Sequence, residues 1–199
     1  MRALWIGFAA LIGSAVPATA GEAVCGGHQI LVPRRPEMSC WNIAPQIIEA
    51  PNRSLRAVIY PADISLDATP DMESRVVIRT QRGDTVLSKD HSSPRGANGH
   101  YVHRGVWSPD SQYFVYSLVS SGGHSPWSFP MWVFSAKRGQ FARFSDMIGN
   151  RPTLSGDFSF AGAHALTATT WPRDGDIEHR LAVTVDLDAA FARIPPSAD

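Results

Sequence analysis

The sequence predicts an all-β protein made of about three four-stranded antiparallel sheets that follow one another along the chain. Two observations lead to this prediction. Short runs rich in β-branched and aromatic residues alternate with turns that contain Gly, Pro or Asp, whereas stretches with the period of an amphipathic helix are few. Similar strand and turn patterns also recur about every fifty residues, as expected for repeated sheets. A β-sandwich is the alternative architecture for the same signals.

The first twenty residues have the pattern of a secretory signal. A positive start at Arg2 precedes an apolar stretch at residues 3–13, and the segment ends in Ala18-Thr19-Ala20, the small-x-small pattern that signal peptidase cleaves. We therefore predict cleavage after Ala20 and a periplasmic or secreted protein. No later segment of the sequence has the roughly 20 apolar residues that a membrane-spanning helix requires, so no membrane span is expected.

Residues 21–43 are expected to form an N-terminal arm that a disulfide pins. The arm contains both cysteines of the chain, Cys25 and Cys40, in a sequence rich in turn residues. An even number of cysteines in an oxidising compartment favours a disulfide, and closing such a loop stabilises a protein by roughly 3 kcal/mol. The sequence has no Cys-x-x-Cys motif, which argues against a redox or metal role for the pair.

Residues 44–199 are expected to form a single β-repeat domain with units at about residues 44–90, 102–146 and 153–195. The first two units each contain a predicted hairpin, with strands at 73–80 and 85–89 in the first unit and at 131–135 and 140–144 in the second. A glycine, Gly83 or Gly139, lies at each hairpin corner, where glycine adopts a positive φ at low cost.

The second and third units resemble each other when one is shifted by about fifty residues. Trp107-Ser108 then aligns with Phe158-Ser159, residues 132–134 with 183–185, and residues 141–144 with 191–194. The first unit is a weaker copy with its turn at residues 51–53. Each unit therefore reads as an inner strand, a tight turn, an apolar strand, a longer loop and a hairpin. Residues 188–193 also suit a helical turn in place of a final strand, and Pro195-Pro196 end regular structure.

The segment Trp107-Ser108-Pro109-Asp110-Ser111 resembles the Trp/Phe-Ser-Pro-Asp-Gly start of the WD-repeat-like blades found in periplasmic propeller proteins, with Ser111 where that family usually has Gly. The resemblance implies blade-like sheets in a partial, propeller-like arrangement. Closed propellers typically have about four to eight blades. Three units therefore imply an open β-structure, or a homo-oligomer in which two chains cover each other's strand edges.

Composition limits the classes of partner. The chain has 199 residues with 18 basic and 18 acidic side chains, so it lacks the overall field that binds nucleic acid or an anionic membrane. Its 44% hydrophobic and 18% charged residues exclude a wholly disordered protein. The sequence contains no phosphate-binding or dinucleotide-binding glycine pattern, and no cofactor is expected.

Four histidines are the candidate metal ligands. His91, His100 and His103 lie in or beside the link between the first two units, and His124 lies in the following loop. Neutral imidazoles bind zinc or copper, and a His-x-x-His pair can converge on one ion. The other interpretation is that they are solvated loop histidines, because a metal site needs three or four ligands whose geometry the sequence does not fix.

The loop at residues 120–130 is the candidate binding segment. Its glycines give backbone freedom, and Trp127 and Phe129, near His124, offer the apolar area typical of interface anchors. Trp171 occupies the corresponding link of the third unit, so both loops are expected to line one end of the structure. Trp127 alternatively folds back to cap its own sheet.

The sequence contains neither a Gly-x-Ser-x-Gly nor a His-Glu-x-x-His motif, and no catalytic residue is assigned. The leading hypothesis is an exported, non-catalytic β-repeat protein that binds a protein or a cell-envelope component through its loops. The alternative is a metal-binding or hydrolytic periplasmic enzyme that uses the four loop histidines.

Overall fold

The computed structural model describes residues 22–25, 28–31, 45–61, 73–93, 98–121, 128–172 and 179–196, with side chains from residue 45 onward. The predicted signal at residues 1–20, its cleavage site and Cys40 lie outside these residues, as does the side chain of Cys25. No disulfide occurs among the described residues, so the Cys25–Cys40 bridge stays a prediction.

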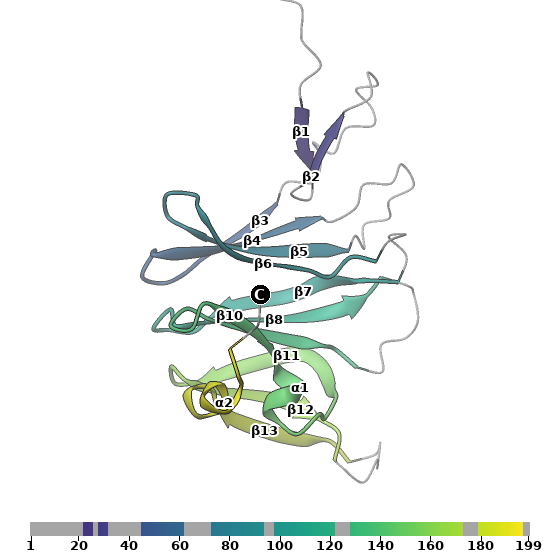
Figure 1. Cartoon of the computed structure of the whole chain (residues 1–199). Helices are drawn as coiled ribbons and strands as arrows, with labels where there is room; N and C mark the ends of the chain where they lie inside the picture. Colours follow the sequence, from purple (N-terminus) through teal and green to yellow (C-terminus); the bar gives the residue numbers. More distant parts are fainter. Residues whose placement is uncertain are drawn as a thin grey trace, which may run out of the picture.

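The fold is all-β, as predicted, and consists of consecutive antiparallel meanders (Figure 1). A two-stranded hairpin contains β1 (Glu22–Cys25) and β2 (His28–Leu31). Sheet 1 contains β3 (Gln46–Glu49), β4 (Leu55–Pro61), β5 (Ser74–Thr80) and β6 (Thr85–Asp90). Sheet 2 contains β7 (His100–Trp107), β8 (Tyr113–Ser120), β9 (Met131–Ser135) and β10 (Gln140–Arg143). Sheet 3 contains β11 (Thr153–Ala161), β12 (Ala165–Thr170) and β13 (Leu181–Asp186).

Both predicted hairpins are confirmed. The β5–β6 pair joins Val77 to Ser88 and the β9–β10 pair joins Phe134 to Phe141, each in antiparallel register. The corner glycines adopt positive φ, +98° at Gly83 and +60° at Gly139, as their positions in the sequence predict.

The prediction of four strands per unit is wrong for sheet 3, which has three. The chain continues from β13 into helix α2 (Leu187–Arg193), as the alternative interpretation of this segment holds. Asp186 caps the helix, because its side chain accepts a hydrogen bond from the Ala189 N–H at 2.9 Å. Apolar side chains at helical spacing then face the core: Leu187, Ala190 and Phe191. Residues 141–144 instead end β10 and start the short helix α1 (Phe144–Met147).

The three sheets stack on one another in chain order (Figure 1). Successive side chains of β8 point to opposite sides of the sheet. Those of its first six residues are all buried, so sheet 2 is covered on both faces. Phe114 and Tyr116 pack with sheet 1 in one core, whereas Tyr113 and Val115 pack with sheet 3, α1 and α2 in the other. The apolar run in β8, with no polar alternation over its first residues, is therefore the signature of a central layer.

The tight turns after the first strands of sheets 1 and 2 share one geometry. The N–H of Arg53 donates to the Ala50 carbonyl at 2.8 Å, and the N–H of Ser111 donates to the Ser108 carbonyl at 2.9 Å. Both turns end on a residue with positive φ, +58° at Arg53 and +66° at Ser111, and Gly162 with φ of +83° follows β11. The described strands form stacked layers and no closed ring, so the likeness to WD-repeat blades stays an interpretation of the sequence.

The meander topology places short connections at one end of the strands and longer connections at the other. The tight turns β3–β4, β7–β8 and β11–β12 lie at one end of the stack, which we call the turn end, where the Asn52 N–H donates to Ser111 Oγ at 3.0 Å. The strand ends from which the sheet-to-sheet links and the longer loops start lie at the opposite end, which we call the link end. Within the described residues, neither helix has the length and hydrophobicity that a bilayer crossing requires.

Candidate ligand-binding site

A pocket of about 470 Å³ opens at the link end, where the β6–β7 link, the start of β9 and the β10–β11 link converge. The topology brings these segments together, because the first strand of a four-stranded meander starts at the same end of the sheet at which the last strand finishes. The side chains that determine its chemistry are two histidines, two arginines, a tryptophan and an aspartate: His91, His100, Arg143, Arg151, Trp132 and Asp146.

His91 forms one wall of the pocket as a neutral imidazole. Burial, together with the positive charge of Lys89, lowers the pKa of His91 to about 4. Its Nε2 lies 2.9 Å from the hydroxyl of Tyr116, a fully buried residue of β8 whose pKa burial raises well above the usual value. Both groups are thus uncharged near neutral pH and form a neutral hydrogen bond across the core boundary.

His100 lies beside His91, because its N–H donates to the His91 carbonyl at 2.9 Å. Burial lowers the pKa of His100, and the nearby carboxylate of Glu73 opposes that shift. Two of the three metal candidates predicted in or beside the first link, His91 and His100, therefore line one pocket.

Buried Glu73 fixes the position of this link. Its carboxylate accepts hydrogen bonds from the Ser93 N–H at 2.5 Å, from Ser121 Oγ at 2.7 Å and from the Gly99 N–H. Burial alone would raise the pKa of Glu73, but these hydrogen bonds lower it, so the carboxylate is ionised. A Cβ at Gly99 would overlap the carboxylate of Glu73, which is why this position requires glycine.

Trp132 carries two cations on its ring. Lys89 Nζ lies 4.5 Å from the ring centroid, and the Arg143 guanidinium carbon lies 5.3 Å from it. Arg143 is the cross-strand partner of Trp132 in the β9–β10 register, which sets this contact. The sequence prediction missed Trp132, Arg143 and Arg151. The available signal was the basic residue at the end of the predicted β10 strand, but its convergence with Arg151 depends on the reversal at α1.

Phe129 and Trp171 flank the segment that closes the pocket. The Phe129 N–H donates to the Thr153 carbonyl at 2.9 Å, and the Trp171 N–H donates to the Pro152 carbonyl at 3.3 Å. Both side chains are half-buried. The two loops expected at one end of the structure therefore do meet the same connection. Two other residues of the predicted binding segment, His124 and Trp127, lie outside the described residues.

His103 is separated in role from the other two described histidines. It lies exposed on β7, with its ring centroid 6.2 Å from that of Phe129, and it is not a lining residue of the pocket. Across the described part of the chain, no set of three or more His, Cys, Asp or Glu side chains is arranged to hold a metal ion. Of the four candidate histidines, two thus line the pocket, His103 lies elsewhere, and His124 lies outside the described residues.

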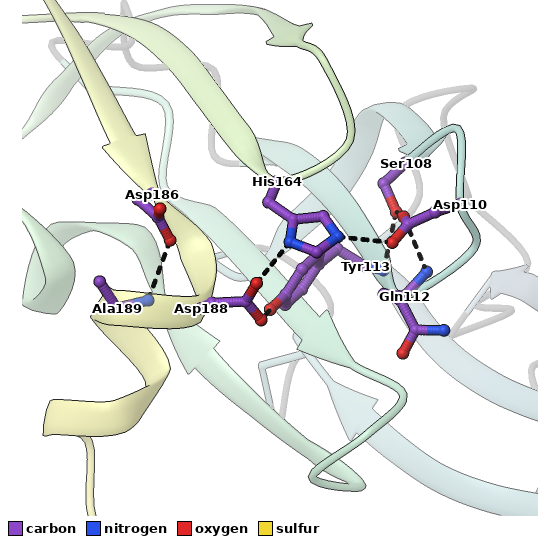
Figure 2. Close-up of polar contacts among 8 residues, drawn as sticks. All are labelled: Ser108, Asp110, Gln112, Tyr113, His164, Asp186, Asp188 and Ala189. Atoms are coloured by element: carbon purple, nitrogen blue, oxygen red, sulfur yellow. Dashed lines mark hydrogen bonds and ion pairs between the residues drawn. The ribbon is translucent and has the colours of Figure 1, made fainter.

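A second polar cluster joins the elements at the turn end (Figure 2). His164, in the β11–β12 turn, lies between two carboxylates, with Nε2 2.7 Å from Asp110 Oδ2 and Nδ1 against Asp188 Oδ2. Asp188 Oδ1 also accepts a hydrogen bond from the Tyr113 hydroxyl at 2.6 Å. We call Asp110, His164, Asp188 and Tyr113 the clasp, because they tie sheet 2 to sheet 3 and α2.

The charges of the clasp reinforce one another. Hydrogen bonds to Asp110 and Asp188 raise the pKa of His164. The Tyr113 hydroxyl and His164 lower the pKa of Asp188 against the effect of burial. Burial raises the pKa of Asp110, but hydrogen bonds from Ser108, the Gln112 N–H and His164 outweigh it and lower the pKa. The two carboxylates therefore favour the charged form of His164, and His164 favours the charged form of both carboxylates.

The clasp does not have the order of a hydrolytic triad. Ser108 Oγ donates to Asp110 Oδ1 at 2.6 Å, so the carboxylate stands between the hydroxyl and His164. In a triad the imidazole must contact the nucleophile directly. Ser108 has 0% exposed surface and also accepts a hydrogen bond from the Tyr113 N–H at 2.9 Å, which makes it a structural group.

Comparison with known proteins gives no family. No protein-family model matches the chain, and no curated protein matches it.

Proposed function

We propose that this protein is an exported, non-catalytic binding protein that recognises a cell-envelope component through the link end of its sheet stack. The observation that carries the proposal is the convergence of three inter-strand connections on one open pocket of about 470 Å³. Pockets of this size hold small molecules or the terminal group of a larger one. Residues from the connections line the pocket, and the stacked sheets support it, which is the usual construction of a recognition site.

The chemistry of the pocket favours binding over catalysis. Its most buried titratable wall group, His91, has a pKa of about 4 and already makes a hydrogen bond with buried Tyr116. A general base acting near neutral pH needs a pKa close to that pH. The Ser108, Asp110 and His164 groups that come together in the structure lie at the opposite end and stabilise the fold.

A steric block tests the proposal. Ser145 lines the pocket, and a Ser145→Trp substitution fills it. We expect the wild-type chain to cosediment with bacterial cell-envelope fragments and the variant to lose at least most of this binding. Gln81→Trp is the matched control, because Gln81 is exposed in the β5–β6 turn at the opposite end. Equal envelope binding by wild type and Ser145→Trp would rule out this pocket as the recognition site.

Export and the disulfide form part of the same proposal. The pattern of residues 1–20 and the pair Cys25 and Cys40 support a mature chain that starts at Gly21 and carries one bridge. Intact mass measurement of protein recovered from the periplasm, with and without reduction, tests both points. A retained Met1 would contradict cleavage, and two free thiols in the mature protein would contradict the bridge.

A further inference from the structure

We infer that the pocket at the link end binds an oxyanion, a carboxylate or phosphate group, with Arg143 and Arg151 as its charge partners. The inference rests on the proposed function, since it names the chemistry of what the pocket recognises. It follows from the charges of the pocket, the hydrogen-bonding state of His91 and the mixed character of the lining.

The two arginines leave the pocket with uncompensated positive charge. Neither Arg143 nor Arg151 forms an ion pair with any carboxylate in the described part of the chain. Asp146 is the one acid among the described lining residues, so a single negative charge faces the two positive charges of the arginines. Lys89 adds a further positive charge next to the pocket, with its Nζ 4.5 Å from the centroid of the Trp132 ring.

Arg151 has a donor without an acceptor. Its Nε is buried and has no hydrogen-bond partner among the described residues. A buried donor on a charged group is costly to leave unpaired, because the group has lost water and gained nothing in exchange. Because this Nε is closed to solvent, a bound carboxylate or phosphate meets the terminal Nη groups of the guanidinium, which bind such oxyanions with paired hydrogen bonds.

His91 adds a neutral donor to the same wall. Because the buried Tyr116 hydroxyl has no other acceptor among the described residues, we assign it as the donor of this hydrogen bond and His91 Nε2 as the acceptor. The imidazole then carries its own proton on Nδ1. His91 lines the pocket, and in this tautomer its Nδ1–H pairs with an acceptor and not with a cation.

The rest of the lining indicates an anion attached to a larger organic group. Apolar surface from Pro130, Met131 and Trp132 lies beside the arginines. The volume of about 470 Å³ also exceeds what a carboxylate or phosphate alone occupies. The pocket therefore suits a ligand whose charged end meets the arginines while its less polar part contacts this wall.

Titration of the mature chain with inorganic phosphate and with acetate tests the inference. Calorimetry gives the affinities, and NMR of arginine Nε–Hε groups shows which side chains respond, with glycerol as the uncharged probe and the ionic strength held constant. We expect saturable shifts of the Arg143 and Arg151 signals. Arg143→Gln and Arg151→Gln should each weaken anion binding about tenfold or more. Arg82→Gln, exposed in the β5–β6 turn, is the control and should leave the affinity unchanged.

The outcomes separate this inference from the proposed function. Absence of phosphate and acetate binding, or equal shifts of the Arg82 signal, overturns the anion site. Envelope binding that Ser145→Trp abolishes but both arginine variants retain overturns the anion site and leaves the proposed function standing. Specific anion binding by a chain that does not bind envelope fragments supports the site and contradicts the proposed function. Circular dichroism of each variant confirms that it is folded before these comparisons are made.

Discussion

Two residues in equivalent tight turns, Arg53 and Ser111, have an unfavourable backbone conformation. Arg53 and Ser111 end equivalent turns with positive φ, a conformation that side chains with a Cβ adopt unfavourably. The sequence comparison identified Ser111 as the position where a blade of this type usually has glycine. Ser111 has a reason to remain serine, because its Oγ accepts a hydrogen bond from the Asn52 N–H at 3.0 Å.

Arg53 has no such hydrogen bond through its side chain among the described contacts, and it is exposed. We therefore expect Arg53→Gly to stabilise the protein by about 0.5–1 kcal/mol, since relief of the positive-φ strain exceeds the entropy that glycine gains in the unfolded chain. Urea unfolding of wild type and variant measures the difference. Ser111→Gly is the comparison, and it should gain less or lose stability because the Asn52 N–H loses its acceptor. A larger gain at Ser111 than at Arg53 would contradict this account.

At the scale of elements, the sequence predicted strands and hairpins well because those signals are local. Alternation, corner glycines and β-branched runs are sufficient to define β5, β6, β9 and β10. The end of the chain was ambiguous for a physical reason. Residues 187–193 place apolar side chains at positions that suit a helix, and the cap at Asp186 decides the choice through a contact with Ala189.

Contacts between elements were not predictable in the same way. In the clasp, His164 contacts Asp110, which is 54 residues away in the sequence, and Asp188, which is 24 residues away. Nothing in the sequence around these residues indicates that they meet. The same holds for Arg143 and Arg151, whose common position depends on how α1 reverses the chain. The link end itself was foreseen from the corresponding places of Phe129 and Trp171 in the second and third units.

The clasp joins separate elements through titratable groups, so it makes the stability of the fold depend on pH. The pKa of His164 is raised in the folded state, so its stabilising effect is complete below the unfolded value near 6.5 and is lost as the pH rises through the folded pKa. The pKa values of Asp110 and Asp188 are lowered, so their contribution is present above about 3.8 and is lost in acid. The clasp therefore contributes most in the window between these limits.

We expect the melting temperature of wild type to exceed that of His164→Gln most near pH 5.5–6, with the gap narrowing as the pH rises above the folded pKa. His164 is 42% exposed, so the gap corresponds to less than about 1 kcal/mol after solvent screening. Thermal unfolding of both proteins at a series of pH values measures it. His103→Gln, at an exposed histidine outside the clasp, is the control. A gap that stays constant or widens toward alkaline pH would refute the assigned charge state.

At the scale of the whole molecule, sheet 2 depends on both neighbours. The face of sheet 2 that packs on sheet 3 and the two helices carries large buried side chains: Tyr113, Val115, Met131 and Val133. The chain therefore folds as a stack rather than as separable units, even though the repeat pattern in the sequence suggests interchangeable modules.

Removal of sheet 3 should consequently unfold more than sheet 3. A chain that ends at residue 150 exposes the apolar face of β8 and β9, and we expect it to aggregate or to bind the dye ANS without a cooperative thermal transition. Removal of the two-stranded hairpin and the rest of the arm by starting at residue 44 is the matched truncation, and it should retain a cooperative transition. A soluble, cooperatively folding chain of residues 21–150 would show that the layers are independent.

Sheets 1 and 2 each have four strands in meander order, so the chain enters and leaves both sheets at the pocket side, and the short turns lie on the other side. An insertion at residues 122–127, between β8 and β9, falls outside the paired residues of both strands and leaves their register intact. A lengthened loop at the pocket side can thus change ligand preference while the sheets keep their pairing, whereas substitutions in the short turns on the other side alter folding first. Grafting a foreign recognition loop between β8 and β9 is the engineering use of that asymmetry.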